Sequence, residues 1–185
     1  MATEIFARWD GDGIFRMEAA LKKLSGPRRI AAARRALNHT GDKVYTRVKR
    51  SLAKQMGLSS QKTFKDGRAL RKKRASGSTL TYEIVSTGRA IRMKEFRWRK
   101  TKTGITAYPW GERHTFKSAF VIQRWGGNIY RRRTSKRFRL EALLGPNINK
   151  EIVKDETAVA FLAVSAELVT RVEHEVRVIT DGVIS

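Results

Sequence analysis

The strongest constraint on this chain is its charge. Among 185 residues there are 40 lysines and arginines but only 17 aspartates and glutamates, which gives a net charge of +23. Hydrophobic residues still make up 41% of the chain, so we expect one domain with a packed core rather than disorder. A body with this excess of cations repels itself. We therefore expect it to bind a polyanion or an acidic protein surface.

The positive charge is unevenly distributed along the chain. Residues 151–185 carry three basic and seven acidic side chains, a net charge of −4. Residues 1–150 carry 37 basic and ten acidic side chains, a net charge of +27. This asymmetry predicts a body that faces a polyanion and a C-terminal end with a different neighbour.

Several classes of protein are disfavoured by what the sequence lacks. There are no cysteines, so disulfides, thiolate metal sites and thiol nucleophiles are excluded. No apolar run approaches the roughly 20 residues that a membrane span needs. The first ten residues do not form a signal peptide, so we expect a soluble protein that stays in the cytoplasm where it is made, with no membrane contact.

Apolar spacing predicts three helices. The first covers residues 14–24, after an N-terminal arm over residues 1–13 with a turn at Asp10–Gly13. The second covers residues 27–56 and has a narrow apolar stripe with cations on its other faces. Its stripe consists of Ile30, Ala33, Leu37, Gly41, Val44, Val48 and Leu52. A long C-terminal helix over residues 149–178 has a stripe made of Val153, Ala160, Val164, Leu168, Val172 and Val176.

Between these helices the pattern indicates strands. The candidate segments are residues 80–84, 116–123, 128–132 and 139–144. Residues 97–115 are rich in Lys, Thr and Gly, and we interpret them as an extended basic loop or an irregular β excursion. Helices, then strands, then a helix predict an α+β fold over residues 1–185: N-terminal helices, a central antiparallel β-sheet with a long basic loop, and a long C-terminal helix.

Groups that could perform catalysis are sparse. His39, His114 and His174 are scattered, with no spacing typical of a metal site or a triad. If Asp10 began a calcium loop, the bidentate acid would fall at Leu21, which cannot bind the ion. No glycine-rich phosphate loop is present. We therefore expect no enzyme activity, no metal site and no cofactor.

The basic clusters are the informative feature, because arginine and lysine neutralise phosphates whatever the base sequence. The residues expected to face DNA or another polyanion are Arg28, Arg29, Arg34, Arg35, Lys43, Arg47, Arg50, Arg71, Lys72, Lys73, Arg74, Arg131, Arg132, Arg133, Lys136 and Arg137. A further basic cluster at residues 97–102 surrounds Trp98. Trp98, Trp110 and Trp125 are candidates for contacts between subunits, with stacking on bases as the alternative for the tryptophans that lie among cations.

Three stretches in order resemble the minor tail protein Z family of tailed phages and prophages, the tail-completion proteins. The first is the Arg/Ala helix that continues into Ala36-Leu37-Asn38-His39-Thr40 and Val44-Tyr45-Thr46-Arg47-Val48. The second is Ala119-Phe120-Val121, followed by Trp125-Gly126-Gly127 and Tyr130-Arg131-Arg132-Arg133. The third is Arg139 to Pro146, which leads through Asn147-Ile148 into the terminal helix.

This resemblance implies a virion protein at the head-proximal end of a long tail. It also implies a hexameric ring that contacts the tail terminator or tail tube protein, the head–tail connector and phage DNA. No catalytic residues are carried over. The chain departs from the family pattern over Lys94–Arg113. In such a ring we expect the acidic C-terminal helix to pack on a neighbour's basic face through Glu173 and Glu175.

Two other functions remain open from the sequence. A small basic α+β protein is also typical of RNA-binding or ribosome-associated proteins. A phage nuclease is the second alternative, but such a site needs paired acids, and Glu83, Glu95 and Glu112 are isolated from one another.

Overall fold

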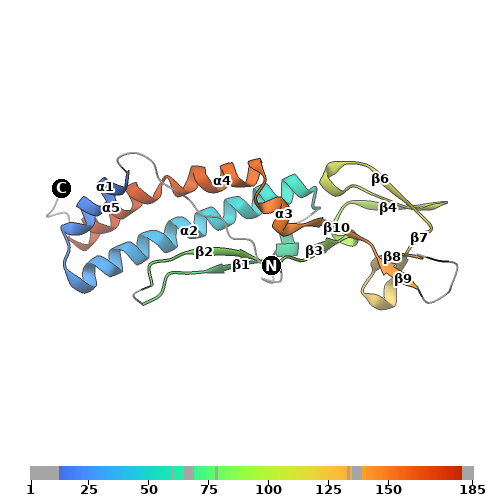
Figure 1. The fold of residues 1–185 in the computed structure, drawn as a ribbon, viewed down its shortest axis with the longest axis horizontal. Helices are drawn as coiled ribbons and strands as arrows, with labels where there is room; N and C mark the ends of the chain where they lie inside the picture. Colours follow the sequence, from blue (N-terminus) through green and yellow to red (C-terminus); the bar gives the residue numbers. More distant parts are fainter. Residues whose placement is uncertain are drawn as a thin grey trace. The chain divides into compact units, whose positions relative to one another are not determined.

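The computed structural model describes residues 13–59, 61–64, 69–77, 79–132, 134 and 139–180. The predicted N-terminal arm, apart from Gly13, lies outside the described residues, as do Arg133, Lys136 and Arg137. The fold is α+β, as predicted (Figure 1). Where the sequence predicts one domain, the chain divides into two compact units. The helical unit comprises Glu4–Val48, Arg71–Val85 and Ala158–Ser185, and the β unit comprises Lys49–Leu70 and Ser86–Thr157, with Met1–Thr3.

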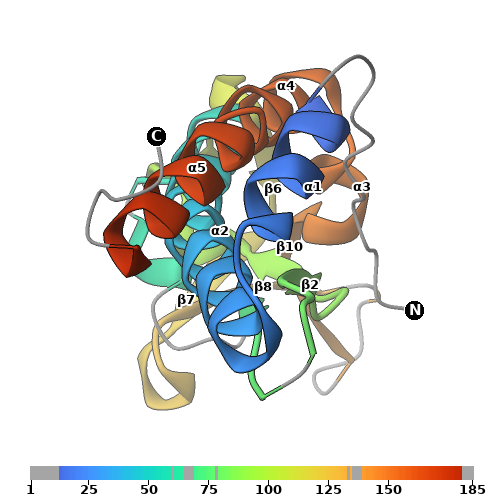
Figure 2. The ribbon, with the colours of Figure 1, turned by 90° about the vertical axis from the view of Figure 1, so that its left-hand side faces the viewer.

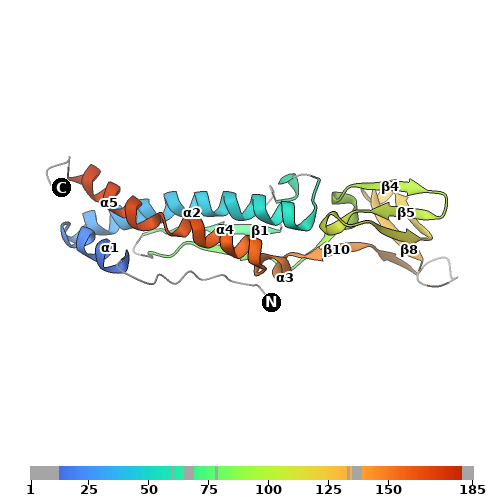
Figure 3. The ribbon, with the colours of Figure 1, turned by 90° about the horizontal axis from the view of Figure 1, so that it is seen from above.

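Three helices build the core of the helical unit. They are α1 (Gly13–Lys22), α2 (Gly26–Met56) and α5 (Leu168–Ile179). Figures 2 and 3 show α5 lying alongside α2, with α1 beside them. Alanines on α2 leave room for the larger apolar side chains of the neighbouring helices, which is how helices reach close packing. The cluster consists of Ala20, Leu24, Ala32, Ala36, Leu168, Val172 and Val176.

The apolar stripe predicted for α2 is largely confirmed. Ala33, Val44, Val48 and Leu52 are buried, whereas Ile30 is exposed near the helix start. The helix continues through Gly41 without a break. In this unit a Cβ at position 41 would lie 2.4 Å from the ring of Tyr82. The glycine therefore makes room for an aromatic ring.

The C-terminal helix, which the sequence predicts as one element, is instead three. They are α3 (Ile148–Ile152), α4 (Asp155–Ser165) and α5. Within the β unit, Gln55 donates to the carbonyl of Glu151 and accepts from the hydroxyl of Thr157. In an unbroken helix these two residues would point about 120° apart, because each residue turns the helix by about 100°. The break at Val153 and Lys154 brings both to the same side.

The described residues of the β unit form three small antiparallel sheets. β3 (Ala90–Arg92) pairs with β10 (Leu144–Asn147). The second sheet has the order β4 (Trp98–Thr101), β5 (Gly104–Ala107), β6 (His114–Lys117). The third has the order β7 (Ala119–Ile122), β8 (Asn128–Arg132), β9 (Leu140–Ala142). The second and third sheets meet where β5 contacts β7.

The predicted basic loop over residues 97–115 is wrong, because this segment forms most of the β4–β5–β6 sheet. Its central strand β5 is buried along its whole length. A Cβ at Gly104 would lie 2.2 Å from the carbonyl oxygen of Phe116, so only glycine permits the close approach of β6. Glycine, alanine and threonine in this strand give it the composition of a loop.

The other strand predictions are right in place but not always in extent. β8 matches the predicted residues 128–132. The predicted strand 116–123 is split at Ser118, whose left-handed backbone (φ 59°) separates β6 from β7. The segment 139–144 is likewise split between β9 and β10. The two remaining strands pair with each other: β1 (Leu70–Lys73), which the sequence does not predict, and β2 (Glu83–Ser86), which overlaps the predicted strand 80–84 only at Glu83 and Ile84.

Candidate polyanion-binding surface

The exposed faces of α2 carry the first set of predicted cations. Opposite the apolar stripe, the helix presents arginines to solvent, and only Arg34 among them is half-buried. The exposed members in the helical unit are Arg28, Arg29, Arg35 and Arg47. Arg50, also exposed, lies on the part of α2 that belongs to the β unit. The helical periodicity therefore separates the core side from the charged side as the sequence predicts.

The basic cluster on β1 is partly neutralised within the helical unit. Lys72 and Arg74 both bind the carboxylate of Asp42, at 2.6 and 3.3 Å, and the hydroxyl of Tyr82 donates to the same group. Burial alone would raise the pKa of Asp42, but the hydrogen bonds from Lys72 and Tyr82 and the charge of Arg74 hold that pKa below its ordinary value.

The remaining two cations of this cluster, Lys73 and Arg71, are also exposed. Lys73 binds Glu83 at 2.8 Å. The β1 cluster therefore offers less uncompensated charge than its sequence suggests.

The cluster with the most open charge lies on the β4–β5–β6 sheet of the β unit. Its five cations are exposed, and none of them forms an ion pair with an acid in the described part of the chain. They are Arg99, Lys100, Lys102, Arg113 and Lys117. We call these five residues the sheet cations. The antiparallel register places Lys100 and Lys117 on the two outer strands, on either side of β5.

The cations of β8 are more constrained. Arg131 forms an ion pair with Glu141 at 3.3 Å, directly across from it on β9. The guanidinium of Arg132 lies over the ring of Phe120, 5.8 Å from its centroid. Both side chains remain exposed, so they can still reach an anion.

The three predicted contact tryptophans are all at least partly exposed. Trp98 is on the edge strand β4, and Trp125 packs edge-on against Tyr130. Trp110 differs, because its indole donates to Glu151 within the β unit and its backbone is left-handed (φ 56°). Its first role is thus to hold the fold together.

The two predicted contact acids are used inside the helical unit. Glu173 binds Arg16 at 2.8 Å, linking α5 to α1. Glu175 is buried and binds Arg171 one turn earlier on α5. The prediction that Glu175 contacts a neighbouring subunit is wrong, because its carboxylate is enclosed by its own chain.

Sequence reasoning missed the surface of α4. In the helical unit this helix exposes Val159 (63%) and Leu162 (49%). It contains Asp155 and Glu156 but no lysine or arginine, so it is the acidic helix of a basic chain. The run TAVAFLAV, apolar on all sides, was the available signal, since such a helix cannot bury every face in a small unit.

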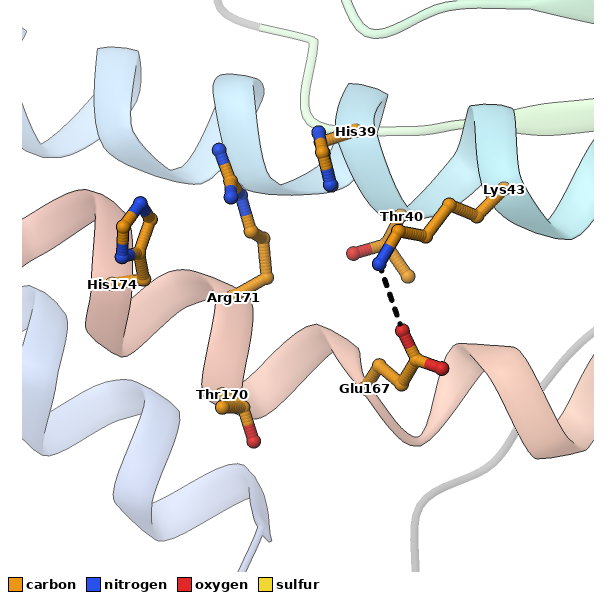
Figure 4. A pocket seen from close by; sticks show the side chains of 7 residues that line it. All are labelled: His39, Thr40, Lys43, Glu167, Thr170, Arg171 and His174. Atoms are coloured by element: carbon orange, nitrogen blue, oxygen red, sulfur yellow. Dashed lines mark hydrogen bonds and ion pairs between the residues drawn. The ribbon is translucent and has the colours of Figure 1, made fainter.

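Sequence reasoning also treated His39 and His174 as unrelated, yet the structure brings them to one groove. α2 supplies His39 and Lys43, and α5 supplies Arg171 and His174 (Figure 4). The groove has a volume of about 340 Å³. At one end the ammonium of Lys43 binds Glu167 at 3.2 Å. The third histidine, His114, lies in the β unit beside the rings of Trp110 and Phe116.

Among the residues that the structure describes, no three His, Asp or Glu side chains are placed to hold a metal ion together. No helix in this described part is both long and apolar enough to cross a membrane. Searches with protein-family models, curated proteins and solved structures gave no significant match to the chain.

Proposed function

We propose that this protein is a non-enzymatic structural subunit of a tailed-phage virion. It completes the head-proximal end of the tail, assembles with copies of itself, and contacts DNA through phosphates. The motif order in the sequence supports the tail assignment. The observation that carries the DNA contact is the set of sheet cations, which are exposed and lack acid partners in the described part of the chain.

The chemistry of these cations favours the DNA backbone over base edges. Arginine and lysine side chains on a small sheet bind phosphate oxygens and release the counterions that surround DNA. No described helix combines such a cluster with polar side chains arranged for base reading, so sequence-independent binding is expected. If each of the five sheet cations contacts one phosphate, affinity falls by about 500-fold between 50 and 200 mM salt.

Self-assembly must overcome the charge. Six copies at +23 carry roughly +140, so isolated subunits repel one another at low salt. The part of α4 in the helical unit is the surface where two copies approach at the lowest electrostatic cost, because residues 158–165 are almost entirely apolar and carry no charged side chain. We therefore expect a monomer or a weak oligomer in isolation, and a ring when a tail end or DNA neutralises the cations.

Locating the protein in particles tests the proposal directly. In virions purified from the phage or induced prophage that encodes it, the protein should be present in a few copies and lie at the head-proximal tail end by immunogold labelling. Particles made without it should have tails that fail to join heads. Co-sedimentation with host ribosomes at moderate salt, together with absence from virions, would overturn the proposal in favour of the RNA-binding alternative.

A further inference from the structure

We propose that the groove between α2 and α5 binds a phosphate group, held by Arg171 with His39 and His174 on either side. Figure 4 shows the guanidinium of Arg171 rising from α5 toward α2, between the two imidazoles. This inference concerns the helical unit alone and goes beyond the proposed role in the tail.

Arg171 provides the observation that points to a ligand. One of its terminal nitrogens binds the buried carboxylate of Glu175. Its Nε is cut off from solvent and has no hydrogen-bond partner in the described part of the chain. A buried N–H without an acceptor is costly, so Arg171 is not fully satisfied by its own chain. The Nε itself is enclosed, and a ligand in the groove would bind the terminal nitrogens, which Figure 4 shows pointing toward α2.

The other groups in the groove are suited to a multivalent anion. His39 and Lys43 bring an imidazole and an ammonium to the same hollow from α2, and His174 brings a second imidazole from α5. Three oxygens of a phosphate can accept from several such donors at once, and guanidinium groups match phosphate geometry. A volume of about 340 Å³ is near the lower end for small-molecule sites and admits a phosphate ester with some water.

Without a ligand, the charged side chains at the groove form two balanced ion pairs, and this balance holds while both imidazoles are neutral. Glu167 is engaged by Lys43, and Glu175 is engaged by Arg171. Burial, followed by the charges of Arg171 and Lys43, lowers the pKa of His39, against the smaller opposing effects of Glu175 and Asp42. Arg171 and Lys43 lower the pKa of His39 by their charge. A bound phosphate dianion would counteract this effect and favour the protonated imidazole of His39.

The phosphate group has two possible sources, the DNA backbone and free phosphate or a small phosphate ester. Both present non-bridging phosphate oxygens to Arg171, two from a DNA diester and at least three from free phosphate or a monoester. The source is therefore a matter for the experiment, whereas the chemistry of the groove is set by its side chains.

The test follows histidine ring signals by NMR in the full-length protein during titration with inorganic phosphate at constant ionic strength. We expect saturable shifts of the His39 and His174 rings and a rise in the pKa of His39. Because the variant H39Q/H174Q lacks these two rings, phosphate binding is followed in all variants by ³¹P line broadening. Binding to H39Q/H174Q should be weaker by about tenfold for each charge-assisted hydrogen bond that is removed. H114Q, which alters the histidine of the β unit, is the matched control and should bind as the unchanged protein does.

A second arm adds a short DNA duplex to the phosphate-bound protein. Displacement of phosphate from the groove identifies the DNA backbone as the source, and binding of both together identifies free phosphate or a small ester. Either result supports the groove as a phosphate site. If neither probe moves the His39 and His174 signals saturably, the inference is wrong. DNA binding retained by H39Q/H174Q would leave the sheet cations and the proposed function intact.

Discussion

The indole nitrogen of Trp110 donates to the carboxylate of Glu151 at a distance of 3.1 Å. Gln55 and Lys154 bind the same carboxylate, at 3.0 and 2.8 Å, and Glu151 is only 3% exposed. One buried acid thus joins the end of α2, the turn after β5 and α3 within the β unit. Two backbone segments of this unit also approach each other closely, since a Cβ at Gly57 would be 2.4 Å from the amide nitrogen of Gly111.

Replacing Glu151 by glutamine should destabilise the β unit. The amide keeps the shape but removes the charge that three donors share, and it turns an acceptor into a donor. We expect a loss of about 1–3 kcal/mol in the free energy of unfolding, measured by urea denaturation. E141Q, which breaks the exposed pair with Arg131, is the control and should cost about 0–1 kcal/mol. Equal effects of the two variants would contradict a special role for Glu151.

The same acid makes the stability dependent on pH. Burial alone would raise the pKa of Glu151, but the hydrogen bonds from Lys154, Gln55 and Trp110 hold it below the ordinary value of 4.5. A lowered pKa in the folded state contributes stability above the unfolded pKa, and this contribution is lost as the pH falls through the folded pKa. Thermal unfolding followed from pH 7 to pH 3 should show this loss. E151Q should lose less stability over that pH range. If the stability of E151Q fell as steeply with pH as that of the unchanged protein, Glu151 would not be the group responsible.

Gly41 is expected to tolerate no side chain while Tyr82 is present. G41A brings a methyl group to 2.4 Å from the ring, and we expect a cost of about 1–3 kcal/mol despite the better helix propensity of alanine. In the Y82A background the obstacle is gone. There G41A should be neutral or stabilise the helix by up to about 1 kcal/mol. Additive effects in the double variant would show that the two residues do not meet.

The sequence was sufficient for elements whose pattern is repeated over many residues. α2 followed from seven positions at helical spacing, and the strand predicted over residues 128–132 coincides with β8. The tripartite C-terminal helix did not follow. Its first break lies where Gln55, about 100 residues away in the chain, binds both Glu151 and Thr157, and no local pattern announces such a contact. β5 was missed because its identity as a strand comes from burial between two neighbours rather than from its own side chains.

The candidate surface was predictable to a similar degree. Clusters of cations are visible in any sequence, and exposure of those on α2 follows from its period. Which cations are already neutralised depends on tertiary contacts, as Asp42 shows by binding both Lys72 and Arg74. The groove at His39 and His174 joins residues more than 130 positions apart, so no local motif could indicate it.

Removing charge from the sheet cations should weaken DNA binding. We expect R99Q/K100Q/K117Q to lower the affinity for any duplex and to reduce the salt dependence, by about one unit of slope for each phosphate that is no longer bound. Filter binding or fluorescence anisotropy at several salt concentrations measures both. The control R16Q/K22Q, compared with R99Q/K117Q, removes the same charge from cations that already bind acids and lie outside the predicted binding surface. If both variants lose affinity equally, the net charge rather than this sheet determines binding.

Introducing charge on α4 should block self-association without unfolding the chain. Val159 and Leu162 are exposed in the helical unit, so V159D/L162D leaves the core there unchanged and should change the free energy of unfolding by less than about 0.5 kcal/mol. If α4 forms the contact between copies, two buried carboxylates per interface would oppose assembly. Sedimentation velocity in moderate salt, with and without duplex DNA, measures the oligomer. The matched control is V178D, which places the same charge on an exposed valine of α5 and should assemble as the unchanged protein does. Normal rings from V159D/L162D would exclude α4 as the contact and leave the tryptophans Trp98 and Trp125 as the next surfaces to alter.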